Sequence, residues 1–328
     1  MAKLNNGHNI AKSIAAKLFA NNSLKNNYEV NINKKTLLPF VKCNASGNDF
    51  ILIKVNQHNR IDGTNIELDT NVVSAICNRH YGVGCDQLFG LVSTNGNKIQ
   101  VVIYNQDGSV VANCGNGMRA VAGYFFKTNP LETSCEIEVL HKKTKKLIIC
   151  KKINSTLVEV CMGNVTITKV QNMVMYNVGN LHNVIEIKND KQQIVNKTQS
   201  QVATAEAYAK LIPVPVSAIP NKTYNSNYIH VLGSDLITLT TVERGVGVTN
   251  CCGSGSCASV AYCVNNGKIK FGKMVKVVTK GSIGAKNSEM FVIVKQTDNN
   301  EMEAKLIGDF KINFYGYLDN FLNTNLLK

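Results

Sequence analysis

Several features that would place this chain among membrane or secreted proteins are missing. No apolar run approaches the roughly 18–20 residues needed to cross a bilayer, and the sequence shows no signal peptide. The 11 cysteines make an odd number, so the disulfide framework of a secreted protein is not expected. We therefore expect a soluble protein of the reducing cytoplasm.

Acidic residues are scarce, because 36 Lys and Arg stand against 22 Asp and Glu and give a formal net charge of +14. A charge of this size raises the hypothesis of a nucleic-acid or membrane partner. The lysines are scattered, however, and the densest group, in residues 142–146, is followed by the apolar residues 147–149. No aromatic residues interleave with it in an RNA-binding pattern. We expect a solvated hairpin or strand edge there, with no nucleic-acid or membrane partner.

Arginine is absent from residues 1–38, which carry six lysines against the single acid Glu29. Organellar transit peptides tend to be rich in arginine, so a loosely attached extension is favoured over the alternative of a targeting peptide. The length of 328 residues suggests about two domains. We expect residues 39–158 plus 308–328 to form the first domain and residues 159–307 the second.

The spacing of apolar residues predicts many strands and few helices. Strands are predicted over residues 50–55, 100–104, 137–140, 147–151, 157–162, 165–170, 184–187, 228–232, 274–279, 290–294, 302–307 and 311–315. Helices are predicted over residues 71–78, 118–126, 199–211 and 258–265. Each half of the chain thus combines several strands with a long helix, and gene duplication is the economical explanation.

The chain contains one short pattern twice, a cysteine followed by Gly-x-Gly and a helical run. It begins at Cys114 and again at Cys252. Unpaired N–H groups and the dipole at a helix N-terminus favour a thiolate and can hold a carboxylate. Two such thiols on opposite faces of one carbon could remove a proton from one side and deliver a proton to the other, which inverts the centre.

Two other interpretations of these cysteines are open. Small buried cysteines often pack at glycine turns without a chemical role, although the repeat argues against this. Zinc binding is the second alternative, because Cys251, Cys252, Cys257 and Cys263 lie close together. Their spacing matches no paired C-x-x-C arrangement and no histidine lies near them, so we expect no metal site.

Motifs in both halves of the chain resemble, in the same order, those of the diaminopimelate epimerase family, whose members use no cofactor. The resemblance extends from about Leu38 to Leu318. The motifs are Ser46–Phe50, Asn78–Gln87, Tyr104–Ser109, Asn113–Arg119, Met162–Gly163, Val178–His182, Asn225, Glu243–Gly247 and Cys252–Gly255.

The resemblance implies an α/β (α+β) fold of two pseudo-symmetric domains. Each would be a curved β-sheet wrapped around a central helix, with the active site in the cleft between them. The strand near residues 311–315 is expected to return to the first domain. The implied activity is the interconversion of LL- and meso-2,6-diaminopimelate for lysine and peptidoglycan synthesis, with Cys114 and Cys252 as the two catalytic groups and neither pyridoxal phosphate nor metal.

The resemblance also implies two groups of substrate-binding residues. The backbone amides of Gly115, Asn116, Gly253 and Ser254 would hold the carboxylate at the reacting carbon, with Asn48 and Gln87 nearby. The distal amino and carboxylate groups would be bound by Asn105, Asn180, Asn225, Glu243 and Arg244. A guanidinium and a carboxylate at adjacent positions suit a zwitterionic end. His182 and Glu243 would help to set the protonation of the thiols, although His182 is equally interpreted as a structural hydrogen bonder.

Other charged residues near these motifs are expected to be structural. Arg79 and Arg119 would brace the architecture, and Asp49, Asp86 and Asp107 would anchor turns or caps.

Three departures from the family pattern bear on substrate preference and loop shape. Asn44-Ala45 stands where the family usually has His-Gly, Leu181 replaces a proline, and Val248 replaces a glutamate. The alternatives are a racemase of another amino acid, such as histidine, on the same fold, and a catalytically silent binding protein. Dimerisation, and oxidation of Cys114 and Cys252 to a disulfide in air, stay open.

Overall fold

The computed structural model describes residues 37–55, 68–142, 144–170, 172–187, 213, 222–284 and 289–319. This part of the chain is mainly β with few helices, so the α/β expectation overstated the helical content. Unit 1 consists of the described parts of Met1–Asn44, Asp49–Thr156 and Phe310–Lys328, and unit 2 of those of Ala45–Asn48 and Leu157–Asp309. The domain boundaries and the cleft expected from the sequence stay predictions.

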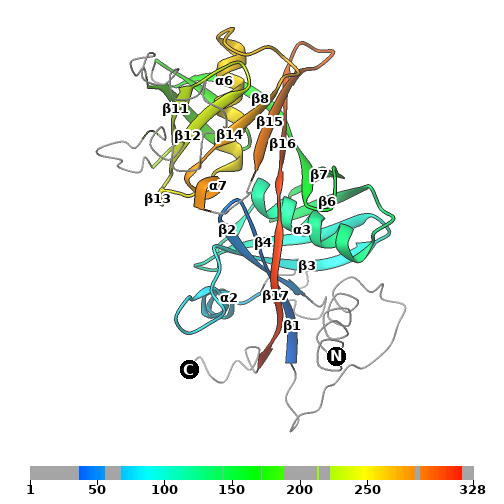
Figure 1. Cartoon of the computed structure of the whole chain (residues 1–328). Helices are drawn as coiled ribbons and strands as arrows, with labels where there is room; N and C mark the ends of the chain where they lie inside the picture. Colours follow the sequence, from blue (N-terminus) through cyan, green and yellow to red (C-terminus); the bar gives the residue numbers. More distant parts are fainter. Residues whose placement is uncertain are drawn as a thin grey trace. The chain divides into compact units, whose positions relative to one another are not determined.

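Unit 1 combines a mixed β-sheet with the helices α2 and α3 (Figure 1). Its elements, some of which share end residues with unit 2, are β1 (Leu37–Ala45), β2 (Asn48–Lys54), α2 (Thr70–Cys77), β3 (Gln87–Asn95), β4 (Lys98–Asn105), β5 (Val110–Val111), α3 (Gly115–Thr128), β6 (Ser134–His141), β7 (Thr144–Lys152) and β17 (Lys311–Asp319). Asp69 caps α2, because its Oδ1 accepts from the backbone N–H groups of Asn71 and Val72.

The sheet of unit 1 mixes parallel and antiparallel pairs. Strand β2 pairs parallel to β3, β3 antiparallel to β4, β4 parallel to β6, and β6 antiparallel to β7. Strand β17 pairs antiparallel to β1, so the predicted C-terminal strand does return to the first part of the chain. Helix α3 packs against β6, β7 and β17. Gly123 of α3 lies against the Phe310 ring, where a Cβ would come within 2.4 Å, so the absence of a side chain permits this close packing.

Unit 2 contains the second cysteine turn and the longest strand. Its elements are β8 (Leu157–Val170), β9 (Met173–Asn177), β10 (Leu181–Glu186), β11 (Asn225–Val231), β12 (Leu236–Glu243), β13 (Gly247–Val248), α6 (Gly253–Asn265), β14 (Met274–Val278), α7 (Lys280–Gly284), β15 (Met290–Gln296) and β16 (Met302–Asp309).

Strands of unit 2 pair in a closed ring. The order is β8, β9, β10, β11, β12, β14, β15 and β16, and β16 pairs again with β8. Helix α6 packs against β8, β9, β10, β11, β12, β15 and β16, so it lies inside the ring (Figure 1). Small residues such as Ala258, Ser259 and Ala261 are fully buried on this helix. They let the helix approach the surrounding strands closely.

The strand pairings of the two units repeat. In unit 2, β10 is parallel to β11, β11 antiparallel to β12, β12 parallel to β14, and β14 antiparallel to β15. This is the same series of pairings as from β2 to β7 in unit 1. In both units the helix that follows the cysteine turn lies, along the chain, between the two strands that pair in parallel. These strands are β4 and β6 in unit 1, and β12 and β14 in unit 2.

Most of the predicted elements are present, with three kinds of difference. The strands predicted at 157–162 and 165–170 form the single strand β8, which continues through Gly163 at φ 84°. Strands β1, β3, β5, β9, β12 and β13 and helix α7 were not predicted from the sequence. Helices α3 and α6 begin directly after their cysteines, earlier than expected. The helix predicted over 199–211 and residues 1–36 of the extension lie outside the described residues, and Leu37 and Leu38 belong to β1.

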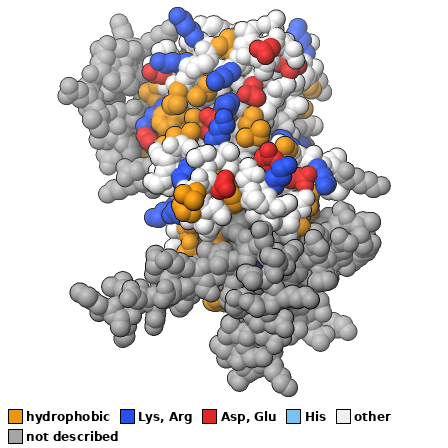
Figure 2. Space-filling model, turned by 90° about the vertical axis from the view of Figure 1, so that its right-hand side faces the viewer, with side chains coloured by type: hydrophobic (Ala, Val, Ile, Leu, Met, Phe, Trp, Pro, Cys, Tyr) orange, Lys and Arg blue, Asp and Glu red, His pale blue; other side chains and the backbone are white. Residues whose placement is uncertain are grey.

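Basic and acidic side chains are interspersed on the face shown in Figure 2. Several exposed lysines pair with acids, including Lys98 with Glu136 at 3.4 Å and Lys145 with Glu138 at 3.7 Å. Lys145 lies on β7 in the hairpin of β6 and β7, and its side chain is exposed. None of the helices in the described part of the chain combines the length and apolar character that spanning a membrane requires.

Candidate functional site

Cys114 occupies the N-cap position of α3. Its backbone is extended, and its Sγ accepts a hydrogen bond from the Gly117 N–H at 3.3 Å. The side chain is half-buried, and the helix that follows is almost completely buried. The amides of Gly115 and Asn116 lie in the first turn, where helical N–H groups have no partner within the helix. The N-terminus of α3 therefore combines a thiol with an anion-binding turn.

Arg119 stabilises this turn from inside the unit. Its guanidinium is fully buried, and Nη2 donates to Asn116 Oδ1 at 2.6 Å. The side chain of Asn116 is thus turned toward the protein, while its backbone N–H stays in the first turn of α3. The expected bracing role of Arg119 is confirmed.

Gln87 and Asn105 meet on neighbouring strands of unit 1. They are paired in the β3–β4 ladder, and Gln87 Nε2 donates to Asn105 Oδ1 at 3.0 Å. Asn105 Nδ2 in turn donates to Ser109 Oγ at 3.1 Å. Gln87 shares its face of β3 with Phe89, because side chains alternate along a strand. The Phe89 ring packs on Gly117, where a Cβ would lie 2.1 Å from it, so this face of β3 is directed toward the first turn of α3.

Cys252 occupies the equivalent N-cap position of α6 in unit 2. It is buried, and Ser256 Oγ donates to its carbonyl oxygen at 2.8 Å. Its Sγ lies 3.5 Å from Ser254 Oγ. Burial, with a smaller contribution from the Glu243 carboxylate, raises the pKa of Cys252 well above its ordinary value. The Ser254 hydroxyl and the Gly255 amide oppose this rise by smaller amounts. Cys252 is therefore a neutral thiol at pH 7.

His182 lies at the centre of a buried polar cluster beside Cys252. Its Nε2 lies 3.0 Å from Ser254 Oγ and its Nδ1 lies 3.3 Å from Asn227 Nδ2. The ring is fully buried. Burial lowers the pKa of His182 to about 4, so the imidazole is neutral at pH 7.

Asn227 determines which nitrogen of His182 carries the proton. Asn227 Nδ2 lies 3.1 Å from Gly255 O, which can only accept, so this atom is assigned as the NH₂ donor. Thr241 Oγ1 donates to Asn227 Oδ1 at 3.1 Å, which agrees with this orientation. His182 Nδ1 must then accept from Asn227, and the proton of the neutral ring sits on Nε2.

The direction of the remaining hydrogen bonds follows from this tautomer. His182 Nε2–H donates to Ser254 Oγ, and the Ser254 hydroxyl is left to donate to Cys252 Sγ. Asn225 Nδ2 lies 3.5 Å from His182 Nε2, and since both atoms are donors this contact is not a hydrogen bond. A directed chain of hydrogen bonds thus runs from Asn227 to the Cys252 sulfur.

Asn225, Glu243 and Arg244 lie close together at neighbouring strand ends. Asn225 is buried, is paired with His182 in the β10–β11 ladder, and accepts a hydrogen bond from the Arg244 backbone N–H at 2.7 Å. Glu243 ends β12 and accepts from Thr249 Oγ1 at 2.7 Å. Arg244 follows on the turn that leads to β13. Of the predicted residues, Asn225, Glu243, Arg244, His182, Ser254 and Cys252 are therefore brought together in unit 2.

The last two predicted binding residues, Asn48 and Asn180, lie where strands begin. Asn180 is exposed, directly before β10, and its carbonyl oxygen accepts from the Val178 N–H at 3.1 Å. Asn48 begins β2 and clusters with unit 2. Its neighbour Gly47, at φ 88°, lies against Gly281 and Asn250, which is two residues before Cys252. Asn48 is thus placed beside the loop that enters α6.

Asn227 and Thr241, which orient His182, were not predicted from the sequence. A signal for Asn227 was present, because it follows Asn225 by two residues and therefore shares its face of β11. Thr241 offered no such signal, since its contact with Asn227 depends on the pairing of β11 with β12.

The zinc alternative finds no support in the cysteines of α6. Cys257 and Cys263 are fully buried, and Cys251 Sγ contacts Met290 Sδ at 3.6 Å. Within the residues that the structure describes, no three His, Cys, Asp or Glu side chains are grouped so that they could hold a metal ion.

The sequence of this chain matches a known protein family. The model of the diaminopimelate epimerase family matches residues 40–168. A diaminopimelate epimerase of Vesicomyosocius okutanii subsp. Calyptogena okutanii is 30% identical over 254 residues, which cover 71% of this chain and 86% of the relative. Another, of Buchnera aphidicola subsp. Baizongia pistaciae, is 28% identical over 260 residues, which cover 72% of this chain and 84% of the relative.

Solved structures show the same fold. A phenazine biosynthesis protein of the PhzF family from Bacillus anthracis has a TM-score of 0.57 at 11% identity, covering 86% of this chain and 99% of that protein. A hydroxyproline epimerase from Agrobacterium vitis has a TM-score of 0.53 at 9% identity, covering 86% and 91%. The protein is an enzyme of the epimerase and racemase class. Within that class, the chain belongs to the diaminopimelate epimerase family.

Proposed function

We propose that this protein interconverts LL- and meso-2,6-diaminopimelate by moving a proton at one α-carbon between two cysteines. In this proposal the two units bind one substrate molecule between Cys114 and Cys252. The observation that carries it is the position of the two thiols, each of which is the N-cap of a buried helix at the same place in a repeated series of strand pairings. This reaction would serve lysine and peptidoglycan synthesis in the cytoplasm.

The two cysteines would have opposite roles in one direction of the reaction. Cys252 is a buried thiol with a raised pKa, which suits a group that delivers a proton. Cys114 is less buried and accepts a hydrogen bond from the Gly117 amide, which suits a thiolate that removes the α-proton. The proton leaves the carbon on the Cys114 side and a proton arrives from Cys252 on the other side. The reverse direction exchanges the roles.

The substrate carboxylate at the reacting carbon would be held by helix N-termini. The amides of Gly115 and Asn116 on α3, and of Gly253 and Ser254 on α6, lie in first turns, where N–H groups are not used by the hydrogen bonds of the helix itself and the helix dipole favours an anion. As the α-proton leaves, negative charge builds up on this carboxylate, and the same donors stabilise it. No further group is required for this step in the proposal.

The residues proposed to bind the distal end of the substrate favour diaminopimelate over an amino acid with an apolar side chain. Arg244 offers a guanidinium for a second carboxylate, and Glu243 a carboxylate for a second ammonium group. Asn225 lies beside them with its orientation fixed by the Arg244 backbone N–H at 2.7 Å. Asn105 and Asn180 would complete the binding of the distal groups.

The three departures from the family pattern leave these groups in place. Asn44 donates to Asn313 Oδ1 at 3.0 Å across β1 and β17. Leu181 is the first residue of β10 and pairs with Asn177 on β9. Val248 lies on β13 with 48% of its side chain exposed. We expect these departures to affect the rate, loop closure or substrate preference.

A panel of amino acids tests the proposal. Purified protein is incubated in D₂O with LL-diaminopimelate, meso-diaminopimelate, histidine, proline and glutamate, and deuterium at the α-carbon is measured by NMR. Exchange and epimerisation confined to diaminopimelate support the proposal. Faster exchange of another amino acid would establish the alternative racemase, and exchange of none would establish a silent binding protein. Arg244→Ala should raise KM for diaminopimelate far more than the control Lys145→Ala, which removes an exposed cation outside the proposed site.

A further inference from the structure

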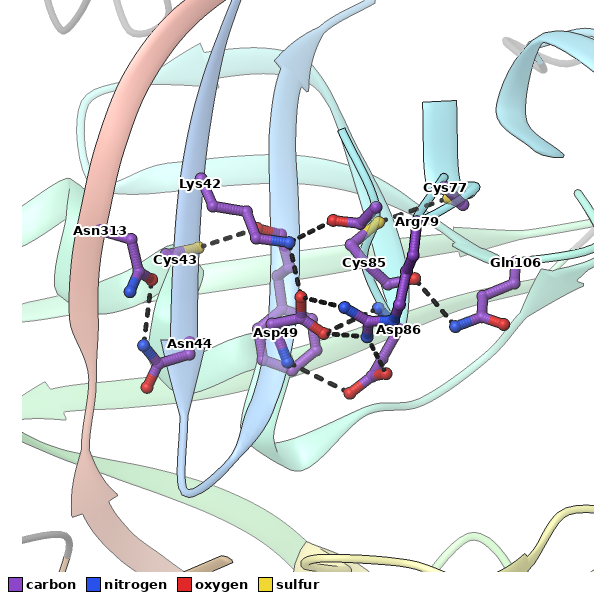
Figure 3. A network of polar contacts seen from close by, with 12 residues as sticks. Lys42, Cys43, Asn44, Asp49, Cys77, Arg79, Cys85, Asp86, Gln106 and Asn313 are labelled. Carbon is purple, nitrogen blue, oxygen red and sulfur yellow. Dashed lines mark hydrogen bonds and ion pairs between the residues drawn. The ribbon is translucent and has the colours of Figure 1, made fainter. Parts of the chain in front are cut away.

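A second pair of sulfur atoms lies in unit 1, apart from the two cysteines of the proposed reaction. Cys77 and Cys85 are both buried and free, and their Sγ atoms are 3.4 Å apart, with Cys85 as the donor (Figure 3). A disulfide has an S–S distance of about 2.05 Å, so bond formation needs an approach of roughly 1.4 Å. Rotation of the two side chains can supply much of that.

The backbone holds the two residues in register. Cys77 ends α2, and the chain turns back so that the Cys85 N–H donates to Cys77 O at 3.2 Å. The N–H groups of Val83 and Gly84 both donate to Ile76 O, at 3.1 and 3.0 Å. These three bonds close the loop of residues 78–84, which keeps the two Cα atoms near each other, as a disulfide requires.

Two cations adjoin the pair. Lys42 is buried and donates to Gly84 O, next to Cys85, and to Asp49 (Figure 3). Arg79, two residues after Cys77, forms a two-pronged ion pair with Asp49 at 2.9 and 2.6 Å and reaches Asp86 at 2.7 Å. Arg79 thus has the bracing role expected from the sequence. Asp49 and Asp86, expected at turns, belong to the same network.

The surroundings assign different roles to the two thiols. The hydrogen bond from Cys85 lowers the pKa of Cys77 in spite of its burial, and the positive charges of Lys42 and Arg79 add to this. The same hydrogen bond, with burial, raises the pKa of Cys85. Cys43, by contrast, has its pKa raised to about 12 by burial. Cys77 is therefore the nucleophile of the pair and Cys85 its proton donor.

We propose that Cys77 and Cys85 form a redox-active dithiol that a small hydroperoxide converts to a disulfide. The Cys77 thiolate attacks one peroxide oxygen, the O–O bond breaks, and hydroxide leaves, which gives Cys77 sulfenic acid. Cys85 then attacks that sulfur, the S–O bond breaks, and water leaves with the Cys85 proton. The dithiol is oxidised by two electrons and the peroxide is reduced by two. A thiol reductant reverses the change. Hydrogen peroxide is the expected oxidant because the buried pair admits only a small molecule.

The sequence provides a direct readout of this bond. Trypsin cleaves after Arg79, between the two cysteines, so Cys77 falls in the peptide 61–79 and Cys85 in the peptide 80–98, with no other cysteine in either. After treatment with hydrogen peroxide, alkylation of free thiols and digestion without reductant, these peptides should be found joined and 2 Da lighter than their sum. Dithiothreitol should separate them. The readout is a mass, so it does not depend on whether the proposed epimerisation is right.

Cys135 and Cys150 provide an internal control, because they are another pair of buried thiols. They face each other across β6 and β7, and neither lies beside the Lys42 and Arg79 network. At one equivalent of peroxide the peptides of Cys77 and Cys85 should join at least roughly tenfold faster than those of Cys135 and Cys150. In the Cys85→Ser variant, dimedone should label Cys77 as sulfenic acid, and in Cys77→Ser it should leave Cys85 unlabelled. Equal rates for the two pairs, or alkylation of Cys77 in full after oxidation of the wild type, would overturn the proposal.

Discussion

His182 Nε2 lies 3.0 Å from Ser254 Oγ, and this contact joins strand β10 to the first turn of α6. Because Asn227 donates to the other ring nitrogen, His182 donates to Ser254 and Ser254 donates to Cys252. A thiol that accepts from Ser254 directs its own S–H away from that hydroxyl. The chain of contacts thus orients the proton that the proposed reaction delivers, without any charge on the imidazole.

The tautomer of His182 is the first prediction. In the wild type at pH 7, imidazole ¹⁵N–¹H correlation spectra should show the proton on Nε2. Asn227→Asp should move the donating proton to Nδ1, because a carboxylate can only accept. Asn183→Asp adds the same charge on β10 beside His182 and should leave the proton on Nε2. A wild-type spectrum with the proton on Nδ1 would contradict the assignment.

Removal of the Ser254 hydroxyl should impair turnover more than folding. Ser254→Ala deletes the donor to Cys252 and leaves a buried N–H of His182 unpaired. We expect kcat to fall roughly ten- to a hundredfold, with the free energy of unfolding about 1–3 kcal/mol lower. The control is Ser259→Ala on the same helix, whose buried hydroxyl has no hydrogen-bond partner. An equal loss of kcat in both variants would show that the hydrogen bonds from Asn227 to Cys252 have no role in turnover.

Two glycines of α3 provide a matched pair. In Gly117→Ala the new Cβ meets the Phe89 ring at 2.1 Å and Cys114 Sγ at 3.2 Å, and in Gly123→Ala it meets the Phe310 ring at 2.4 Å. Both should lower the free energy of unfolding by about 1–3 kcal/mol, because each overpacks a buried contact. Only Gly117→Ala should also lower kcat of the folded protein, since only it displaces the Cys114 turn. Urea unfolding and initial rates, measured on the same samples, separate the two effects.

Acid should destabilise the protein through His182. Burial lowers the pKa of His182 to about 4 from an ordinary value of 6.5. Between these pH values the unfolded chain binds more protons, so the free energy of unfolding falls as pH falls, by about 3 kcal/mol over the window. His182→Gln should lack this slope in urea unfolding between pH 7 and 4. Asp49, with a pKa of about 2, loses its contribution only at lower pH. Parallel curves for variant and wild type would exclude His182 as the cause.

Local patterns in the sequence were sufficient for the two cysteine turns and for most strands. The N-cap positions of Cys114 and Cys252 follow from residues adjacent in the chain, so the helices were predicted, although they begin a few residues earlier. Strand β3 was missed because Gly90 and the polar residues 93–95 interrupt its apolar run. Its parallel pairing with β2 stabilises it through contacts distant in sequence.

The chain of hydrogen bonds from Asn227 to Cys252 could not be predicted from sequence patterns. His182, Asn227 and Ser254 come from three elements, and side chains of these types are also common on protein surfaces. Their roles depend on burial, and burial depends on the closed ring of unit 2 around α6. Val165 and its neighbours likewise looked like a separate strand, because Gly163 resembles a break. In the structure, β8 continues through Gly163, and its pairing with β16 shifts in register there.

The most direct test of the two-thiol mechanism is the epimerisation rate of LL-diaminopimelate by purified Cys114→Ala and Cys252→Ala, each compared with the wild type in D₂O. Cys43→Ala, which removes a buried thiol outside the proposed reaction, serves as the control. The mechanism predicts that both catalytic variants form no meso product, while the wild type forms meso product carrying one deuterium at the inverted carbon. Near-wild-type turnover by either Cys114→Ala or Cys252→Ala would contradict it.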